Sequence, residues 1–218
     1  MRRRRIAVLG GSFDPVHNGH VALGALFTQL LDADELRIVP AGDPWQKIGL
    51  QAPTSARLNM VEVAFADMPV AVTIDPQETL RVGATYTIDT LQALREEFGP
   101  EPSLALLIGA DQLLRLHTWR RWREIFDHAH ICVASRPGFS IEAGQLSPAV
   151  QEIFSQRLST VGQVCEQSHG LSFLSRDLAI EVSATIIRSM LWNGESPEEL
   201  VPARVLDYIQ QHNLYKRP

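Results

Sequence analysis

Short apolar runs separated by longer mixed segments organise this chain. Five of these runs show no alternation of apolar and polar residues, and they occupy residues 6–9, 36–39, 70–74, 104–108 and 131–134. A run of this length without alternation is typical of a strand that is buried on both faces. Residues 171–174 form a sixth candidate strand.

Segments with a helical spacing of apolar residues lie between these runs. They cover residues 21–31, 55–66, 87–98 and 119–126, and residues 183–192 and 202–212 follow as closing helices. Strands that alternate with helices indicate a parallel sheet covered on both faces. We therefore expect an α/β fold with a Rossmann-like, doubly wound sheet. It forms one domain over residues 1–218, with a helical part from about residue 183. Residues 138–170 are polar, and within them residues 148–158 predict a further helix.

The composition fits a globular protein and adds an uneven distribution of charge. The chain has 218 residues, of which 45% are hydrophobic, so it can bury a substantial core. The net charge is −5, but residues 2–5 hold four of the 20 basic residues. The remainder carries 16 basic against 25 acidic residues, or −9, so a broad nucleic-acid-binding face is not expected.

The arginine run at residues 2–5 is open to two readings, a basic arm or the n-region of a signal peptide. Four apolar residues follow before the first glycines, which is too short for a signal h-region. We expect a solvated tail that leads into the first strand. No stretch is long enough to span a membrane. The chain has only two cysteines, Cys132 and Cys165, and they lack the spacing of a metal site. Cys132 lies in an apolar run, so we expect it to be a buried thiol, and we expect a cytoplasmic protein.

Residues 10–20, with the sequence GGSFDPVHNGH, join the first strand to the first helix. Such a junction turns backbone N–H groups and the positive end of a helix dipole toward an anion, usually a phosphate. If the helix begins near Asn18, His17 and His20 both lie on its opening turn and face one ligand. Each piece alone is weak, because glycine turns and histidines near helix starts are common. At the edge where open α/β sheets bind ligands, the combination predicts a nucleoside triphosphate site.

Residues 10–20 resemble the signature of the nucleotidylyltransferase superfamily, and within it the chain resembles the bacterial nicotinate-mononucleotide adenylyltransferases. Four further segments agree in order and spacing: residues 57–60, residues 85–91, residues 109–111 with Trp119, and residues 182–188. The resemblance extends from residue 6 to about residue 208 and is weakest between residues 138 and 170. It implies transfer of the adenylyl group of ATP to nicotinate mononucleotide in NAD biosynthesis, which gives nicotinate adenine dinucleotide and pyrophosphate.

The resemblance implies catalytic roles at the ATP phosphates for His17, His20 and Arg188. Arginine suits this role because its planar fork binds phosphate through two hydrogen bonds. Further ATP-binding positions lie at turns and helix starts, and they are Gly10, Gly11, Ser12, Phe13, Gly19, Lys47, Gly109, Asp111, Ser183 and Thr185. Ser183 also fits a simple N-cap, which is the structural alternative for that position. At residues 44–47 the family usually shows Pro-Pro-His-Lys, whereas Gln46 replaces the histidine here.

The mononucleotide is expected across the carboxyl edge of the sheet. The resemblance implies contacts of Thr85 and of the backbone N–H of Arg120 with the nicotinate carboxylate, and stacking of Trp119 on the pyridine ring. Arg136 follows the fifth predicted strand, where we expect it to bind the mononucleotide phosphate. The alternative for Trp119 is a half-buried anchor beside Trp122. The neighbouring arginines could also suggest RNA stacking, which the acidic remainder of the chain disfavours.

The expected cofactor is Mg²⁺ that enters bound to ATP and needs few protein ligands, so no protein metal site is expected. The Asp111 carboxylate can bind ribose hydroxyls or help to hold this ion. Two alternatives remain open at this point. The same chemistry could act on nicotinamide mononucleotide, phosphopantetheine or a cytidylyl-transfer pair, or the chain could be a non-enzymatic nucleotide-binding module. A homo-oligomer also remains open, and no nucleic-acid or membrane partner is expected.

Overall fold

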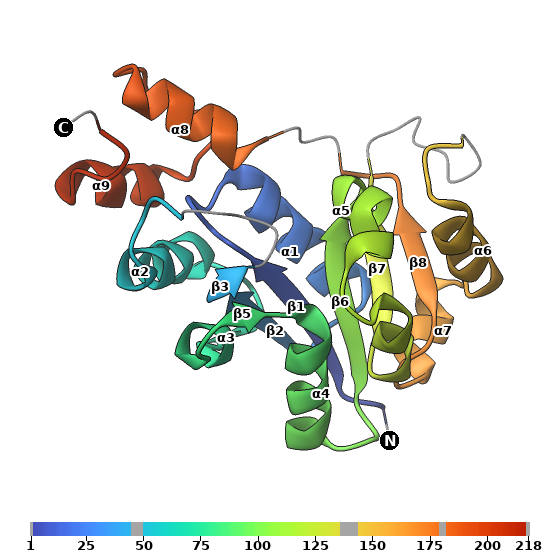
Figure 1. The fold of residues 1–218 in the computed structure, drawn as a ribbon. Helices are drawn as coiled ribbons and strands as arrows, with labels where there is room; N and C mark the ends of the chain where they lie inside the picture. Colours follow the sequence, from blue (N-terminus) through green and yellow to red (C-terminus); the bar gives the residue numbers. More distant parts are fainter. Residues whose placement is uncertain (1, 45–49, 136–143, 179–181, 217–218) are drawn as a thin grey trace.

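A parallel sheet of six strands forms the centre of the molecule in the computed structural model, which describes residues 2–44, 50–135, 144–178 and 182–216 (Figure 1). The strands are β1 Arg5–Gly11, β2 Glu35–Pro40, β4 Ala71–Ile74, β6 Ser103–Gly109, β7 His130–Ala134 and β8 Ser172–Ser175. Their order is β4-β2-β1-β6-β7-β8. The chain therefore builds outward from β1 to one edge, returns to β6 beside β1, and builds to the other edge. The doubly wound α/β fold predicted from the sequence is confirmed, with its topological switch point between β1 and β6.

Helices cover both faces of this sheet. The longer ones are α1 Asn18–Leu30, α2 Thr54–Phe65, α4 Thr87–Phe98, α6 Pro148–Gln156, α8 Ala184–Trp192 and α9 Ala203–Gln211. Shorter elements are α3 Gln77–Leu80, α5 Ala110–Arg115, α7 Val161–Glu166 and the 3₁₀ helices η1 Leu116–Thr118 and η2 Trp122–Asp127. A second, two-stranded parallel sheet pairs β3 Asp43–Pro44 with β5 Ala84–Thr85.

Two apolar clusters fill the space between the sheet and its helices, one on each face. Alternate strand residues belong to different clusters: Ala7 and Leu9 of β1 face the cluster that includes Phe27 of α1, whereas Ile6 and Val8 face the other. This alternation explains why the buried stretches of β1 and β6 are continuously apolar, whereas Arg37 interrupts the apolar run of β2. Ile187 of α8 and Ile209 of α9 join the first cluster, so the C-terminal helices share the main core.

Most of the strand predictions are confirmed, and the exception is at an edge. All six residues of β2 and all five of β7 are buried. In β4, by contrast, exposed and half-buried residues alternate. Burial of residues 70–74 on both faces was therefore a wrong prediction, because β4 pairs only with β2 and forms the edge of the sheet. Cys132 is fully buried as expected, and burial raises the pKa of its thiol.

The helix predicted over residues 119–126 is also wrong. Arg121 adopts a left-handed backbone with φ of 51°, which interrupts any α-helix there. Trp119 ends η1, and η2 follows as a 3₁₀ helix. The helix predicted over residues 148–158 is confirmed as α6, which Ser147 caps by accepting a hydrogen bond from Val150 N–H.

Residues 2–5 are held against the molecule by ion pairs rather than forming a free tail. Arg2 pairs with Asp34 at 2.5 Å, and Arg4 pairs with the buried Glu35 at 2.7 Å. Arg5 begins β1 and pairs with Asp32 at 3.2 Å. Exposed pairs of this kind contribute little stability individually. Together they use the arginine charge locally, so the run does not form an unpaired basic surface.

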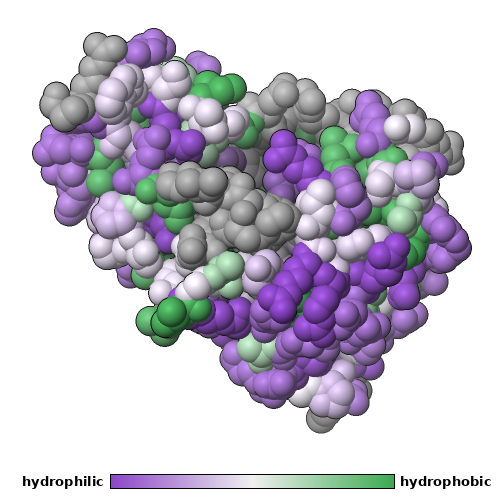
Figure 2. Space-filling view, in the orientation of Figure 1, coloured by the Kyte–Doolittle hydropathy of each residue, from purple (hydrophilic) through white to green (hydrophobic). Residues whose placement is uncertain are grey.

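The visible surface is mainly polar, with apolar residues in scattered small patches (Figure 2). One patch lies where Figure 1 places α3, at the lower left, and Leu80 and Val82 are highly exposed in this segment. Single exposed apolar residues are normal on proteins. Among the described residues, no helix has the length and apolar character needed to cross a lipid bilayer.

Candidate active site

A cleft of about 1080 Å³ opens at the carboxyl ends of the central strands. Its floor includes Gly10 and Gly11 at the end of β1 and Gly109 at the end of β6. Its walls include the first residues of α1, α4, α5 and α8. Several helix N-termini therefore point their positive ends at one space, which favours bound anions.

His17 and His20 form a stacked pair at the mouth of α1. Their ring centroids are 3.6 Å apart and the planes differ by 19°. The backbone N–H of His17 donates to Nδ1 of His20 at 3.2 Å. Because Nδ1 accepts, a neutral His20 ring carries its proton on Nε2, which can donate to a ligand. Both residues line the cleft, as the sequence pattern led us to expect.

Gly19 allows this arrangement of the imidazoles. A Cβ atom at Gly19 would lie 3.1 Å from Nδ1 of His17, so a side chain there would push on the ring. Phe13 supports the pair from the other side, with its ring edge-on to His20 at 4.9 Å. The Phe13 side chain is fully buried and does not line the cleft. Its side chain is thus a support under His20 rather than a contact surface for adenosine.

Arg57 holds the phosphate-side turn from behind. Its side chain is almost fully buried, and Nη1 donates to the carbonyl oxygen of Ser12 at 2.9 Å. Burial lowers the pKa of this guanidinium from its ordinary value. Arg57 forms no ion pair among the described residues, so its contact with the turn is its main polar interaction.

The start of α8 forms a second wall on the phosphate side. Ser183 occupies the N-cap position, but within the described structure its side chain makes no capping hydrogen bond. Ser183 and Thr185 are both exposed and line the cleft. Arg188 is half-buried behind Thr185, with Nη2 3.4 Å from the hydroxyl oxygen of Thr185. Its Nη1 donates to the carbonyl oxygen of Asp14 at 2.7 Å, which ties α8 to the glycine turn.

The opposite half of the cleft brings together Thr85, Trp119 and Arg120. Thr85 is buried in β5, directly before α4. The guanidinium carbon of Arg120 lies 4.6 Å above the ring of Tyr86, which also lines the cleft. Trp119 is half-buried, and its Nε1–H has no hydrogen-bond partner among the described residues.

Gly109 and Asp111 line the space between the two halves. Asp111 is exposed at the start of α5, and one of its carboxylate oxygens accepts a hydrogen bond from Gln112 at 2.7 Å. No group of three or more His, Cys, Asp or Glu side chains able to hold a metal ion occurs in the described ranges. Lys47, the neighbouring Gln46 and Arg136 lie outside the described residues.

Sequence reasoning missed two charged residues of the cleft, Glu78 and Arg115. Glu78 is buried at the cleft wall and accepts a hydrogen bond from the hydroxyl of Thr90 at 2.6 Å. Arg81 in turn donates to the Thr90 hydroxyl at 3.0 Å. Glu78 lies in α3, a four-residue helix with no periodic apolar pattern. The feature of the sequence that could have indicated Glu78 is the presence of two charged residues, Glu78 and Arg81, shortly before the segment that contains Thr85.

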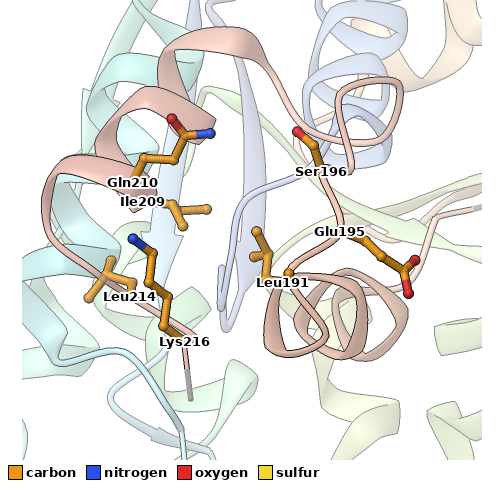
Figure 3. Close-up of a pocket in the computed structure, with 8 residues that line it drawn as sticks. Leu191, Glu195, Ser196, Ile209, Gln210, Leu214 and Lys216 are labelled. Atoms are coloured by element: carbon orange, nitrogen blue, oxygen red, sulfur yellow. The ribbon is translucent and has the colours of Figure 1, made fainter. Parts of the chain in front are cut away.

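A second, smaller hollow of about 280 Å³ lies among the C-terminal helices (Figure 3). Leu191 at the end of α8 faces Ile209 of α9 and Leu214 across it, and Glu195 and Lys216 lie at its rim. None of its lining residues belongs to the large cleft.

Comparisons with known proteins agree with this geometry. The model of the cytidylyltransferase-like family matches residues 8–190. A protein of Herminiimonas arsenicoxydans named "Probable nicotinate-nucleotide adenylyltransferase" is 54% identical over 98% of this chain and 97% of its own length. A protein of Dechloromonas aromatica with the same name is 40% identical, over 97% of each chain.

Solved structures share the fold at low sequence identity. The nicotinic acid mononucleotide adenylyltransferase of Plasmodium falciparum, complexed with NaAD, aligns with a TM-score of 0.74 over 98% of both chains at 16% identity. A second structure of that protein, complexed with APC, aligns with a TM-score of 0.69. Because the family model covers most of the chain and the relatives match it end to end, the chain belongs to the nucleotidyltransferases of the cytidylyltransferase-like family, among the nicotinate-nucleotide adenylyltransferases.

Proposed function

We propose that this protein transfers the adenylyl group of ATP to nicotinate mononucleotide, giving nicotinate adenine dinucleotide and pyrophosphate. The observation that supports this most directly is the stacked pair of His17 and His20 at the N-terminus of α1, inside a cleft of about 1080 Å³. The names of the relatives specify the same reaction, at up to 54% identity. The reaction would take place in the cytoplasm, since both cysteines are buried free thiols.

In this reaction a phosphate oxygen of the mononucleotide attacks the α-phosphorus of ATP. The new P–O bond forms as the bond from the α-phosphorus to the bridging oxygen breaks, and that oxygen leaves with pyrophosphate. Charge develops on the phosphoryl oxygens, so catalysis depends on position and on electrostatic stabilisation. No covalent bond to the protein is required.

His17, His20 and Arg188 are the catalytic residues of this proposal. The two histidines place N–H donors at the triphosphate, and the contact of His20 Nδ1 with His17 N–H puts the proton of a neutral His20 ring on Nε2. The backbone of Gly10, Gly11, Ser12, Phe13 and Gly19 surrounds the adenosine and phosphates. Thr185, Ser183 and Arg188 hold the β- and γ-phosphates from α8, with Lys47 as a further cation. Gly109 and Asp111 contact the ribose of ATP.

Mg²⁺ is the proposed cofactor, carried into the cleft on ATP. The residues present fit this arrangement, because Asp111 offers one exposed carboxylate and Mg²⁺ on a nucleotide keeps most of its water ligands. When bound, the ion neutralises charge on the triphosphate as pyrophosphate leaves.

The mononucleotide occupies the half of the cleft that contains Thr85, Trp119 and Arg120. Trp119 stacks on the pyridine ring, while Thr85 and the backbone of Arg120 bind the nicotinate carboxylate. Arg136 is the proposed partner of the mononucleotide phosphate. The N-terminus of α4 begins at Thr87 beside this space, and its positive end favours the carboxylate.

The test is release of pyrophosphate from ATP with a panel of acceptors at equal concentration. We expect turnover with nicotinate mononucleotide well above that with nicotinamide mononucleotide or phosphopantetheine, and loss of turnover when CTP replaces ATP. Preference for another acceptor would assign the same chemistry to a different substrate. Nucleotide binding without release of pyrophosphate from any pair would indicate a binding module and reject the proposed reaction.

A further inference from the structure

Asp14 connects the phosphate-side turn to three distant parts of the chain. The residue is 3% exposed, and its carboxylate accepts three hydrogen bonds. Oδ1 accepts from the hydroxyl of Tyr215 at 2.7 Å and from Ala52 N–H at 3.0 Å, and Oδ2 accepts from Gln51 N–H at 2.9 Å. Its carbonyl oxygen accepts from Nη1 of Arg188 at 2.7 Å. One residue of the turn thus contacts the segment before α2, the segment after α9, and α8.

Tyr215 is the longest-range partner in this cluster, 201 positions from Asp14. Its side chain is 8% exposed and belongs to the main apolar core. Burial and the hydrogen bond to Asp14 both raise the pKa of the Tyr215 hydroxyl, so it stays a proton donor at neutral pH. Leu214 and Lys216, its two neighbours, form one side of the hollow in Figure 3.

The contact between Asp14 and Arg188 decides where the guanidinium lies. Nη1 is held by the turn, and Nη2 lies 3.4 Å from Thr185 Oγ1 at the cleft wall. A carbonyl oxygen can hold Nη1 in one place only if the peptide that carries it is fixed. The three hydrogen bonds to the Asp14 carboxylate fix that peptide, and the hydroxyl of Tyr215 is the only side-chain donor among them.

We propose that Asp14 and Tyr215 are positioning residues for ATP, which hold the Arg188 guanidinium beside Thr185 at the wall of the cleft by fixing the turn that Arg188 contacts. The inference rests on the proposed function, because it takes the ligand of this half of the cleft to be a nucleoside triphosphate. Neither side chain touches the ligand. Both act through Arg188 and the backbone of the turn.

The experiment compares Tyr215→Phe with Tyr208→Phe. Phenylalanine keeps the buried ring and removes only the hydroxyl. Tyr208 is the matched control, because its hydroxyl accepts a hydrogen bond from Asn59 on α2 at 3.0 Å, outside the cleft. The dissociation constant of α,β-methylene-ATP, measured by titration calorimetry without acceptor, should rise about fivefold in Tyr215→Phe, the effect of one lost hydrogen bond. It should stay within about twofold of the original value in Tyr208→Phe.

A double-mutant cycle separates positioning from loss of stability. In an Arg188→Ala background, Tyr215→Phe should weaken the analogue no further, because the group through which Tyr215 acts is gone. Equal weakening in both backgrounds, or none in either, would overturn the proposal. Thermal unfolding of all variants verifies that the measured protein is folded. A merely structural hydroxyl would lower the melting temperature and leave the affinity of folded protein unchanged.

The readout also keeps this inference distinct from the proposed reaction. If the unaltered protein binds the analogue but releases no pyrophosphate with nicotinate mononucleotide, the reaction is rejected and the cycle still decides the role of Tyr215. If turnover is present, Tyr215→Phe should raise KM for ATP and leave KM for the mononucleotide unchanged. A protein that does not bind the analogue would overturn both.

Discussion

The chemistry of this molecule is concentrated in side chains whose positions depend on their immediate neighbours. His20 is oriented by the backbone N–H of His17 on one nitrogen and by the edge of Phe13 on its face. The sequence was sufficient to identify both histidines, because their spacing is local. The sequence also led us to expect Phe13 on the nucleotide side of the turn, because the sequence of a turn does not show whether a side chain points into the cleft or into the core.

Removal of either imidazole should reduce turnover strongly. His17→Ala and His20→Ala each delete a donor to charge that develops in the transition state, so kcat should fall about a hundred- to a thousandfold. His20→Gln should retain more activity than His20→Ala, because its amide can donate from a position close to that of Nε2. Steady-state kinetics of the purified variants measure both effects.

His212→Ala is the control, because His212 is exposed on the C-terminal segment, its ring packs against Tyr208, and it does not line the cleft. It should keep normal turnover. A near-normal kcat in both His17→Ala and His20→Ala would contradict the mechanism.

Gly42 shows a residue-scale requirement that the sequence did not reveal. A Cβ atom there would lie 2.0 Å from the carbonyl oxygen of Glu78, which is backbone and has no room to yield. Gly42→Ala should therefore destabilise the protein by about 1–3 kcal/mol and raise KM for the mononucleotide, since Glu78 and Thr85 flank the same half of the cleft. Urea unfolding and kinetics measure these changes.

The matched substitution is Gly162→Ala in α7, where the nearest atom to the added Cβ is 3.9 Å away. It should be neutral or slightly stabilising, because alanine favours a helix over glycine. Equal stability of the two variants would show that the approach of Gly42 to Glu78 is not a tight constraint.

At the level of elements, the sequence predicted best those strands whose residues are buried in the core. The central residues of β1, β6 and β7 are buried on both faces, so each of these strands contains an uninterrupted apolar run. In β2 the run is interrupted by Arg37, whose charge is paired with Glu35, Asp75 and Glu97. The errors occur where the backbone conformation of a few residues determines whether a helix or strand forms. The φ of 51° at Arg121 ends a predicted helix, and the two-residue strands β3 and β5 are too short to leave a pattern. Helix α3, which contains Glu78, is likewise too short to show a periodic pattern in the sequence.

The start of α4 should determine which mononucleotide is accepted. Its positive end lies beside the cleft at Tyr86 and Thr87, and Arg120 lies over the Tyr86 ring, so a carboxylate on the pyridine ring is favoured over a neutral amide. A buried polar mismatch costs about 1–3 kcal/mol, so kcat/KM should be about 5- to 150-fold higher for nicotinate than for nicotinamide mononucleotide. Equal efficiency with both substrates would contradict an acid-selective pocket.

Trp119 belongs to the same half of the cleft and should act on the same substrate. Trp119→Ala removes the surface on which the pyridine ring stacks, so KM for the mononucleotide should rise several-fold while KM for ATP changes little. Trp192→Ala is the control, because Trp192 is 45% exposed at the end of α8 and does not line the cleft. Unchanged KM for the mononucleotide in Trp119→Ala would remove the stacking role.

At the scale of the whole molecule, the order of the strands determines where the cleft lies, and the C-terminal helices contribute residues and contacts to it. The switch point between β1 and β6 opens the cleft, and this much follows from the alternation of strands and helices in the sequence. The return of the C-terminal segment does not follow. The contacts from Asn18 N–H to the Leu200 carbonyl and from Tyr215 to Asp14 join residues nearly the length of the chain apart. No local sequence pattern specifies these contacts, because they form only between elements that the folded core has already brought together.

Stability of the whole fold should decrease at mildly acidic pH because of His130. This residue is fully buried at the start of β7, its Nε2 lies 3.0 Å from the Gln167 carbonyl, and its Nδ1 accepts from Leu171 N–H at 3.1 Å. Burial lowers the pKa of His130 to about 4. In the unfolded chain the ring takes up its proton near the ordinary pKa of about 6.5, so below that pH only the unfolded state gains the proton. The part of the free energy of unfolding that the neutral His130 contributes is complete above about pH 6.5. It is lost as the pH falls toward 4, by about 2 kcal/mol between pH 7 and pH 5.

Urea unfolding at pH 7, 6 and 5 measures this dependence of the free energy of unfolding of the protein on pH. His130→Asn should be less stable at pH 7 and show a flatter dependence, whereas His212→Asn should keep the original slope. The same slope in His130→Asn as in the unaltered protein would assign the acid sensitivity to other groups.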